Sequence, residues 1–182
     1  RMTMKRIVFV MLSTLLLFTS TSSYSIRADE TDSFEIPAIN TGIIDLDKDQ
    51  NIIIKTDEGV WTILFFDNLN DGKNSQETWQ LGDYDKNVTA SYQKGTQYIT
   101  LSACFRGNIS SVKSTMTSIH DEQCVCTFTK MGKICSITVP ESTSGSGAKG
   151  YYQQTLKNGI STFSVTLTVE VRPDRTAIIT IG

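Results

Sequence analysis

The sequence predicts an all-β protein, a single β-sandwich or partly open barrel of about seven to nine mostly antiparallel strands. Three observations lead to this prediction. Residues 163–171 alternate apolar and polar side chains with a period of two, which is typical of a strand with one buried face. Segments rich in β-branched and aromatic residues recur along the chain, separated by turn residues. Amphipathic helical periodicity is almost absent, so at most one short helix is expected.

The first strands are expected at residues 51–56 and 60–66, which are rich in Ile, Phe and other strand-forming residues. Between them Asp57 and Gly59 stand where a tight turn favours these residue types. Three aromatic side chains of the second segment are expected in the core: Trp61, Phe65 and Phe66.

The middle of the chain predicts two hairpins with an ambiguous segment between them. Residues 87–93 and 96–105 flank Lys94-Gly95, which favours a hairpin turn. Residues 124–139 predict a second hairpin that turns at Met131-Gly132. Between the hairpins, apolar residues recur at three- and four-residue steps, which favours a short helix or an irregular crossover. These residues are Ile109, Val112, Met116 and Ile119.

The C-terminal part begins with residues 141–150, whose Gly and Ser content predicts a flexible loop. Residues 151–159 predict a strand or one helical turn. The alternating segment that ends at residue 171 and the apolar segment 176–181 then predict two further strands. Between them Pro173 suits the first central position of a type I turn.

The first 28 residues have the three parts of a secretory signal peptide. Three basic residues precede an apolar run at 7–20, which is shorter than the roughly 20 residues that a membrane-spanning helix needs. A small-residue stretch follows, in which cleavage is expected after Ala28, with Ser25 as the alternative. We therefore expect a secreted or cell-surface protein with a leader (1–28), a flexible segment (29–40) and one sandwich domain (41–182).

The charge balance argues against two classes of partner. The whole chain has 17 basic and 19 acidic residues, and the leader holds four of the basic residues and no acidic one. The remaining chain is therefore clearly acidic. Binding to nucleic acid depends on basic patches, so it is not expected, and binding to an anionic membrane surface is not expected either.

Four cysteines follow the leader: Cys104, Cys124, Cys126 and Cys135. An even number in an exported chain predicts disulfide bonds, and four cysteines allow three pairings. If Met131-Gly132 is a two-residue loop, Cys126 becomes a diagonal neighbour of Cys135, which leaves Cys104 for Cys124. The competing interpretation is a structural zinc site formed by His120, Cys124, Cys126 and Cys135. The unusual C-x-C spacing and an oxidising compartment favour cross-links over zinc.

Two further candidate sites stand in polar segments. Alternating oxygen ligands at Asp45, Asp47, Asp49 and Asn51 suit a calcium ion, although the sixth and twelfth positions of this segment lack the Gly and Glu of an EF-hand loop. Turn chemistry is the competing explanation. Four aromatic residues in polar contexts suit a binding platform for a protein or carbohydrate ligand: Trp79, Tyr84, Tyr151 and Tyr152.

Catalytic motifs are largely absent from the sequence. No G-x-S-x-G, P-loop or H-E-x-x-H motif occurs, and His120 is the only histidine. We therefore expect a non-enzymatic, exported recognition module that resembles an adhesin or an inhibitor in its mode of action. One alternative is a self-assembling or pore-forming subunit that uses an exposed edge strand. The other is a hydrolase with a carboxylate pair drawn from Asp57, Glu58, Asp83 and Asp85.

Overall fold

The computed structural model describes residues 34–68, 82–143 and 145–182. Within them, Glu35–Gly182 belong to one compact unit. The predicted leader and Trp79 lie outside the described residues. The described part contains eleven strands: β1 (Ile39–Asp45), β2 (Gln50–Lys55), β3 (Val60–Asp67), β4 (Asp83–Lys94), β5 (Gln97–Ile109), β6 (Ser114–Cys126), β7 (Thr129–Val139), β8 (Glu141–Ser142), β9 (Ala148–Asn158), β10 (Ser161–Val171) and β11 (Thr176–Ile181).

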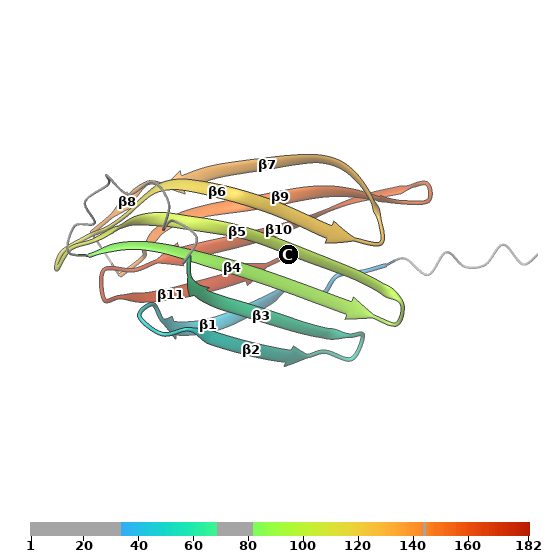
Figure 1. Cartoon of the computed structure of the whole chain (residues 1–182), viewed down its shortest axis with the longest axis horizontal. Coiled ribbons are helices and arrows are strands. Elements are labelled where there is room, and N and C mark those ends of the chain that lie inside the picture. Colours follow the sequence, from blue (N-terminus) through green and yellow to red (C-terminus); the bar gives the residue numbers. More distant parts are fainter. Residues whose placement is uncertain (1–33, 69–81, 144) are drawn as a thin grey trace, which may run out of the picture. The chain divides into compact units, whose positions relative to one another are not determined.

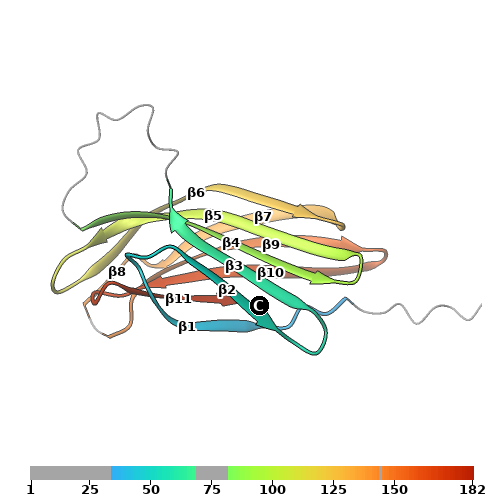
Figure 2. The ribbon, with the colours of Figure 1, turned by 60° about the horizontal axis from the view of Figure 1, so that its bottom comes forward.

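The strands form two antiparallel sheets, which Figures 1 and 2 show from two directions. One sheet has the strand order β1-β11-β10-β9-β7 and the other has the order β2-β3-β4-β5-β6-β8. The predicted all-β class is confirmed, whereas the strand number exceeds the predicted seven to nine. No helix in the described residues has the length and hydropathy that a membrane crossing requires.

The core lies between the inner faces of the two sheets. In β10, Val165, Leu167, Val169 and Val171 are buried, as the alternating pattern predicted. In β3, Trp61 and Phe65 are buried, and the Trp61 ring packs against Tyr92 with 5.0 Å between ring centroids. The prediction for Phe66 was wrong, because neighbouring residues of a strand point to opposite faces and Phe66 is 36% exposed.

The layers approach closely where β9 passes β6. A Cβ atom on Gly150 would lie 2.6 Å from the sulfur of Met116 and 2.8 Å from the side chain of Ile119. Beside this contact, the backbone N–H of Ala148 donates to the Ser114 hydroxyl over 3.0 Å. A side chain larger than hydrogen at residue 150 would push the layers apart.

Three predicted turns are confirmed. The turn between β2 and β3 leaves Lys55 opposite Val60, and the turn between β10 and β11 contains Pro173. Between β4 and β5 the hairpin forms with its loop at Gly95-Thr96, one residue later than predicted, because Lys94 still pairs with Gln97 and Gly95 has a positive φ of 59°. This hairpin fixes the register of two of the three strands that carry the candidate site.

The segment 109–119, for which a short helix or an irregular crossover was expected, contains the last residue of β5, a turn and the first part of β6. The register with β5 shifts between Arg106 and Gly107, so β6 carries one extra residue there. A bulge of this kind breaks the two-residue alternation. Met116 and Ile119 consequently both contact Gly150 from the inner face, although they are three residues apart.

The predicted hairpin at 124–139 was also wrong. The chain turns at residues 127–128, and β6 and β7 belong to different sheets, so they do not pair with each other. Gly132 lies within β7 opposite Thr155 of β9 rather than in a turn. Cys126 faces Ile99 and Cys135 faces Tyr152, so the register that favoured a Cys126–Cys135 bond does not exist.

Candidate functional site

The outer face of the six-stranded sheet carries a row of polar side chains along β4 and β5, which we name the polar ladder. Ser91 and Thr100 bond through their hydroxyls over 2.9 Å, and the Thr89 hydroxyl donates to Ser102 over the same distance. Alternation along the strands directs these residues outward, while the residues between them enter the core. The ladder consists of Asn87, Thr89, Ser91, Thr100 and Ser102.

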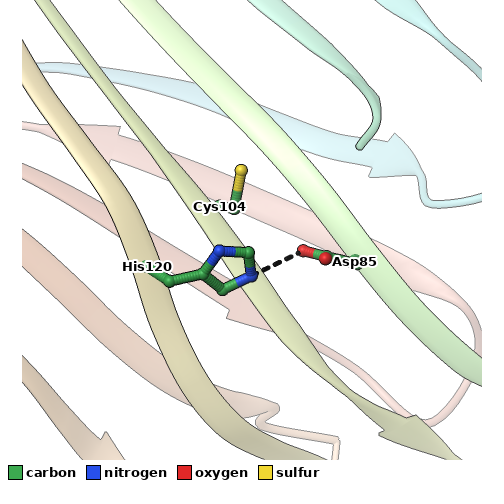
Figure 3. A group of neighbouring side chains, drawn as sticks. All are labelled: Asp85, Cys104 and His120. Atoms are coloured by element: carbon green, nitrogen blue, oxygen red, sulfur yellow. Dashed lines mark hydrogen bonds and ion pairs between the residues drawn. The ribbon is translucent and has the colours of Figure 1, made fainter. Parts of the chain in front are cut away.

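A charged group continues the ladder toward the end of β4 at which Asp83 lies. Asn87 pairs with Cys104 across β4 and β5, and Cys104 pairs in turn with His120 of β6. The ligand atoms of Asp85, Cys104 and His120 lie within 4.8 Å of one another, and Figure 3 shows these three side chains gathered from three strands. With their charged neighbours they form what we name the Asp85 cluster: Asp85, Cys104, Arg106, His120 and Asp121.

The Asp85 carboxylate is the centre of this cluster and is only 3% exposed. Its Oδ2 accepts hydrogen bonds from Nη2 and Nε of Arg106, over 3.0 and 3.3 Å, and from the Asn68 amide over 3.2 Å. Its Oδ1 lies 3.2 Å from Nε2 of His120. A buried carboxylate requires such partners, because burial removes the water that would otherwise stabilise its charge.

His120 is oriented from two sides. Its Nδ1 lies 3.0 Å from Oδ2 of Asp121, so both ring nitrogens face carboxylates. Asp121 has a positive φ of 55°, and the register between β5 and β6 shifts between Ser102 and Cys104. This bulge places His120 on the outer face, although Cys124, four residues later, is buried on the inner face.

The cluster has the residue types of a cysteine nucleophile with its base, but its geometry does not activate the thiol. Both nitrogens of His120 are engaged by carboxylates, so neither is directed to Cys104 as a base. Burial raises the pKa of the Cys104 thiol above its ordinary value, and the hydrogen bond from Asn87 offsets this only in part. What the cluster offers is one sulfur, one nitrogen and one oxygen donor at one place.

All four cysteines are free thiols in the structure, so it contains neither predicted cross-link. Cys104 points to the outer face of the sheet and Cys124 to the inner face, which keeps their sulfur atoms on opposite sides of one layer. The alternative zinc set is separated for the same reason, since His120 lies on the outer face and Cys124 on the inner one. This separation of His120 from Cys124 could not be predicted from the sequence, because the bulge at Asp121 that causes it has no recognisable residue pattern.

The Cys124 thiol provides a prediction about pH. Burial, and next the neighbouring Cys126, raise its pKa to about 12 from an ordinary value of 9.0. The folded protein thus holds this proton more tightly than the unfolded chain does. The associated stabilisation is complete below pH 9 and is lost as the pH rises toward 12.

In the reduced protein at pH 8, iodoacetamide should therefore label Cys124 at least about 100-fold more slowly than it does in urea, because thiolate is scarce and the site is closed. Peptide mass spectrometry measures the rate, with glutathione in the same solution as the reference thiol. Labelling of Cys124 in the native protein at the rate seen in urea would contradict the burial.

Of the four aromatic residues predicted to form a binding platform, the structure describes three, and two of these three are buried. Tyr84 is buried in the six-stranded sheet and donates its hydroxyl proton to the Thr115 carbonyl over 2.8 Å. Tyr152 is buried in the five-stranded sheet, where its hydroxyl donates to Gln154. Tyr151 neighbours Tyr152 but points to the other face of that sheet, and Trp79 lies outside the described residues.

The carboxylates weighed for calcium and for hydrolysis have separate partners. Asp45 pairs with Lys48 over 2.8 Å, and Nε of Arg175 donates to Asp47 over 2.7 Å. Asp49 accepts the Asp67 backbone N–H, and Asn51 belongs to β2. Of the hydrolase candidates, Asp57 and Glu58 lie in the β2–β3 turn, and Asp83 accepts the Asn108 amide over 2.7 Å. Within the described ranges, Asp85, Cys104 and His120 are the single group of three metal-ligating side chains that lie within 4.8 Å.

Comparisons with known proteins give no family. No protein-family model matches the chain, and no curated protein matches it. Among solved structures, it is similar to the crystal structure of a hypothetical protein from Listeria monocytogenes EGD-e, with a TM-score of 0.42 and 15% identity. The alignment covers 76% of this chain and 98% of the other chain. A similarity this low carries no inference about function.

Proposed function

We propose that this chain is an exported recognition module that acts by binding rather than by catalysis, and that its binding surface is the outer face of β4, β5 and β6. The leader-like residues 1–28 and the acidic balance of the rest support export and a partner other than nucleic acid. The partner is a protein or a carbohydrate, whose hydrogen-bonding groups suit a face of hydroxyls, amides and charges.

The Asp85 cluster is the observation that carries this proposal. The outer face of the other sheet also has a hydroxyl pair, Thr155 with Ser164, and a carboxylate, Glu170, that pairs with Lys149 and Arg172. The Glu170 side chain is 13% exposed, whereas that of Asp85 is 1% exposed. The Asp85 carboxylate is nearly buried and is contacted by both Arg106 and His120. A sheet face that only has to be compatible with water does not require such a buried charged group. Groups fixed on strands by their neighbours hold the rigid geometry that recognition requires.

The alternative of assembly through an edge strand has less support. The exposed edge strand β7 carries Lys130 and Lys133 and has two register shifts against β9. The opposite edge strand of that sheet, β1, is interrupted by a register shift between Asn40 and Ile43. Lysines and bulges on edge strands oppose pairing with a second copy.

The experiment compares two lysine substitutions on arrays of immobilised oligosaccharides and extracellular proteins. Ser102→Lys places a bulky charge in the polar ladder beside the Asp85 cluster, and Ser164→Lys places the same group on the outer face of the other sheet. We expect Ser102→Lys to weaken binding to the recognised probe by at least about 10-fold, while Ser164→Lys binds as the wild type does. Equal binding by both variants would reject this surface, and turnover of an array substrate would reject a purely binding role.

A further inference from the structure

The geometry of the Asp85 cluster points to a metal site that the sequence did not reveal. We propose that Asp85, Cys104 and His120 bind one divalent transition-metal ion, and that Zn²⁺ fits this donor set best. The inference goes beyond the proposed recognition function and does not depend on export or on a macromolecular partner. It would hold for this cluster even if the polar ladder bound nothing.

The donor atoms select the class of ion. One cysteine sulfur, one imidazole nitrogen and one carboxylate oxygen form a mixed set that suits zinc and its neighbours in the first transition series. Calcium and magnesium prefer sites built from oxygen, and this group supplies a single carboxylate. Three protein ligands leave the fourth tetrahedral position to water or to a donor atom from another molecule.

The spacing of the donors agrees with this assignment. In a tetrahedral zinc site with bonds of about 2.0–2.1 Å, a nitrogen and an oxygen ligand lie about 3.3 Å apart. Nε2 of His120 and Oδ1 of Asp85 are already 3.2 Å apart. The Cys104 sulfur lies within 4.8 Å of one ring nitrogen of His120 and one carboxylate oxygen of Asp85. In a zinc site it would have to lie about 3.6 Å from the nitrogen and the oxygen ligand, which requires a side-chain movement.

Each of the three donors is held by a second residue. Asp121 faces Nδ1 of His120 over 3.0 Å, which leaves Nε2 as the nitrogen directed toward Asp85. Arg106 and the Asn68 amide occupy Oδ2 of Asp85, so Oδ1 is the oxygen directed toward His120. The Asn87 amide lies 3.3 Å from the Cys104 sulfur. Supporting contacts of this kind, above all a carboxylate behind a histidine, orient the ligands in metal sites.

The charges of the Asp85 cluster balance when a divalent cation is added. Cys104 binds as the thiolate and releases its proton to solvent, so the cluster then carries three negative charges with Asp85 and Asp121. Arg106 supplies one positive charge and the ion supplies two, which gives a neutral group. This neutrality explains how a cation is accommodated although Arg106 is only 3.0 Å from Asp85.

The chain contains a second set of thiols, and the experiment must distinguish metal binding by those thiols from metal binding at the Asp85 cluster. Cys124 and Cys126 stand on β6 two residues apart, on the side of the sheet opposite Cys104. A metal held by those thiols would have more than one sulfur ligand. Cys126→Ser is therefore the matched control for Cys104→Ser, because each removes one thiol and both lie on neighbouring strands.

The experiment titrates the reduced, metal-free full chain with Co²⁺ under visible and near-ultraviolet spectroscopy, and with Zn²⁺ by calorimetry. We expect one ion per chain and a thiolate-to-cobalt charge-transfer band. Cys104→Ser should remove this band and weaken zinc binding by about 100-fold or more, and Asp121→Asn should weaken it by about 10- to 100-fold. Cys126→Ser should bind as the wild type does.

Circular dichroism and urea unfolding of each variant establish that it is folded before its affinity is compared. The proposal is overturned if the wild type binds neither ion with a Kd below about 100 μM, since a site with three protein ligands should exceed that affinity. It is also overturned if Cys104→Ser binds as tightly as the wild type, or if Cys126→Ser is the variant that loses the ion.

Discussion

Replacing Phe65 by alanine is expected to lower the free energy of unfolding by about 3–5 kcal/mol, whereas the same change at its neighbour Phe66 lowers it by about 1 kcal/mol. Phe65 is fully buried on the inner face of β3, and Phe66 is 36% exposed on the outer face. The Phe65 ring also lies 5.5 Å from the ammonium of Lys86, which pairs with Asp67. The truncation therefore leaves a cavity beneath a buried cation.

Urea unfolding followed by tryptophan fluorescence measures both variants. Because domains of this size are stabilised by only about 5–15 kcal/mol, Phe65→Ala should move the midpoint to much lower urea, while Phe66→Ala should stay close to the wild type. Equal losses from the two substitutions would contradict the assignment of the inner and outer faces of β3. The two variants control for each other, because both remove a phenylalanine ring from β3 and differ in the face of the strand from which it is removed.

Replacing Asp85 by alanine is expected to lower the free energy of unfolding by about 2–3 kcal/mol. The substitution leaves Arg106 and His120 without the carboxylate that both contact. Their side chains are about a quarter to a third exposed, so water partly replaces the lost partner and the effect stays below that of a fully buried ion pair. Asp85→Asn keeps an acceptor oxygen and should lose about half as much.

Asp45→Ala serves as the comparison, because Asp45 belongs to an exposed ion pair with Lys48. Exposed pairs contribute about 0–1 kcal/mol, so this variant should unfold almost as the wild type does. Urea unfolding at pH 7 and low salt compares the three substitutions. If Asp85→Ala were no more destabilising than Asp45→Ala, the carboxylate would not be the centre of a buried network.

The part of the Asp85 cluster that lies on β4 and β5 could be predicted from the sequence. The residues around Gly95 predict the β4–β5 hairpin, and the turn at Gly95-Thr96 sets the register that places Asp85 opposite Arg106 and Asn87 opposite Cys104. Turn chemistry and two-residue alternation are local signals, which is why they also identified β10, β11 and the turn between β2 and β3 correctly.

The part on β6, His120 and Asp121, could not be predicted, because β6 is irregular. Its bulges place Met116 and Ile119 on one face and give Asp121 a positive φ, so the segment reads as helical in its first part. With β6 misassigned, no signal in the sequence placed His120 beside Cys104. The predicted disulfides rested on the number of cysteines and on a hairpin at 124–139 that does not form, because β6 and β7 belong to different sheets. A count contains no information about which face of a strand each sulfur occupies.

The most direct test of the Asp85 cluster as a metal centre is X-ray absorption at the zinc edge of the loaded, reduced full chain. We expect one sulfur atom at about 2.3 Å and nitrogen or oxygen atoms at about 2.0–2.1 Å, with multiple scattering from one imidazole. Two or more sulfur neighbours, or none, would contradict the site, because the cluster supplies a single thiol, that of Cys104.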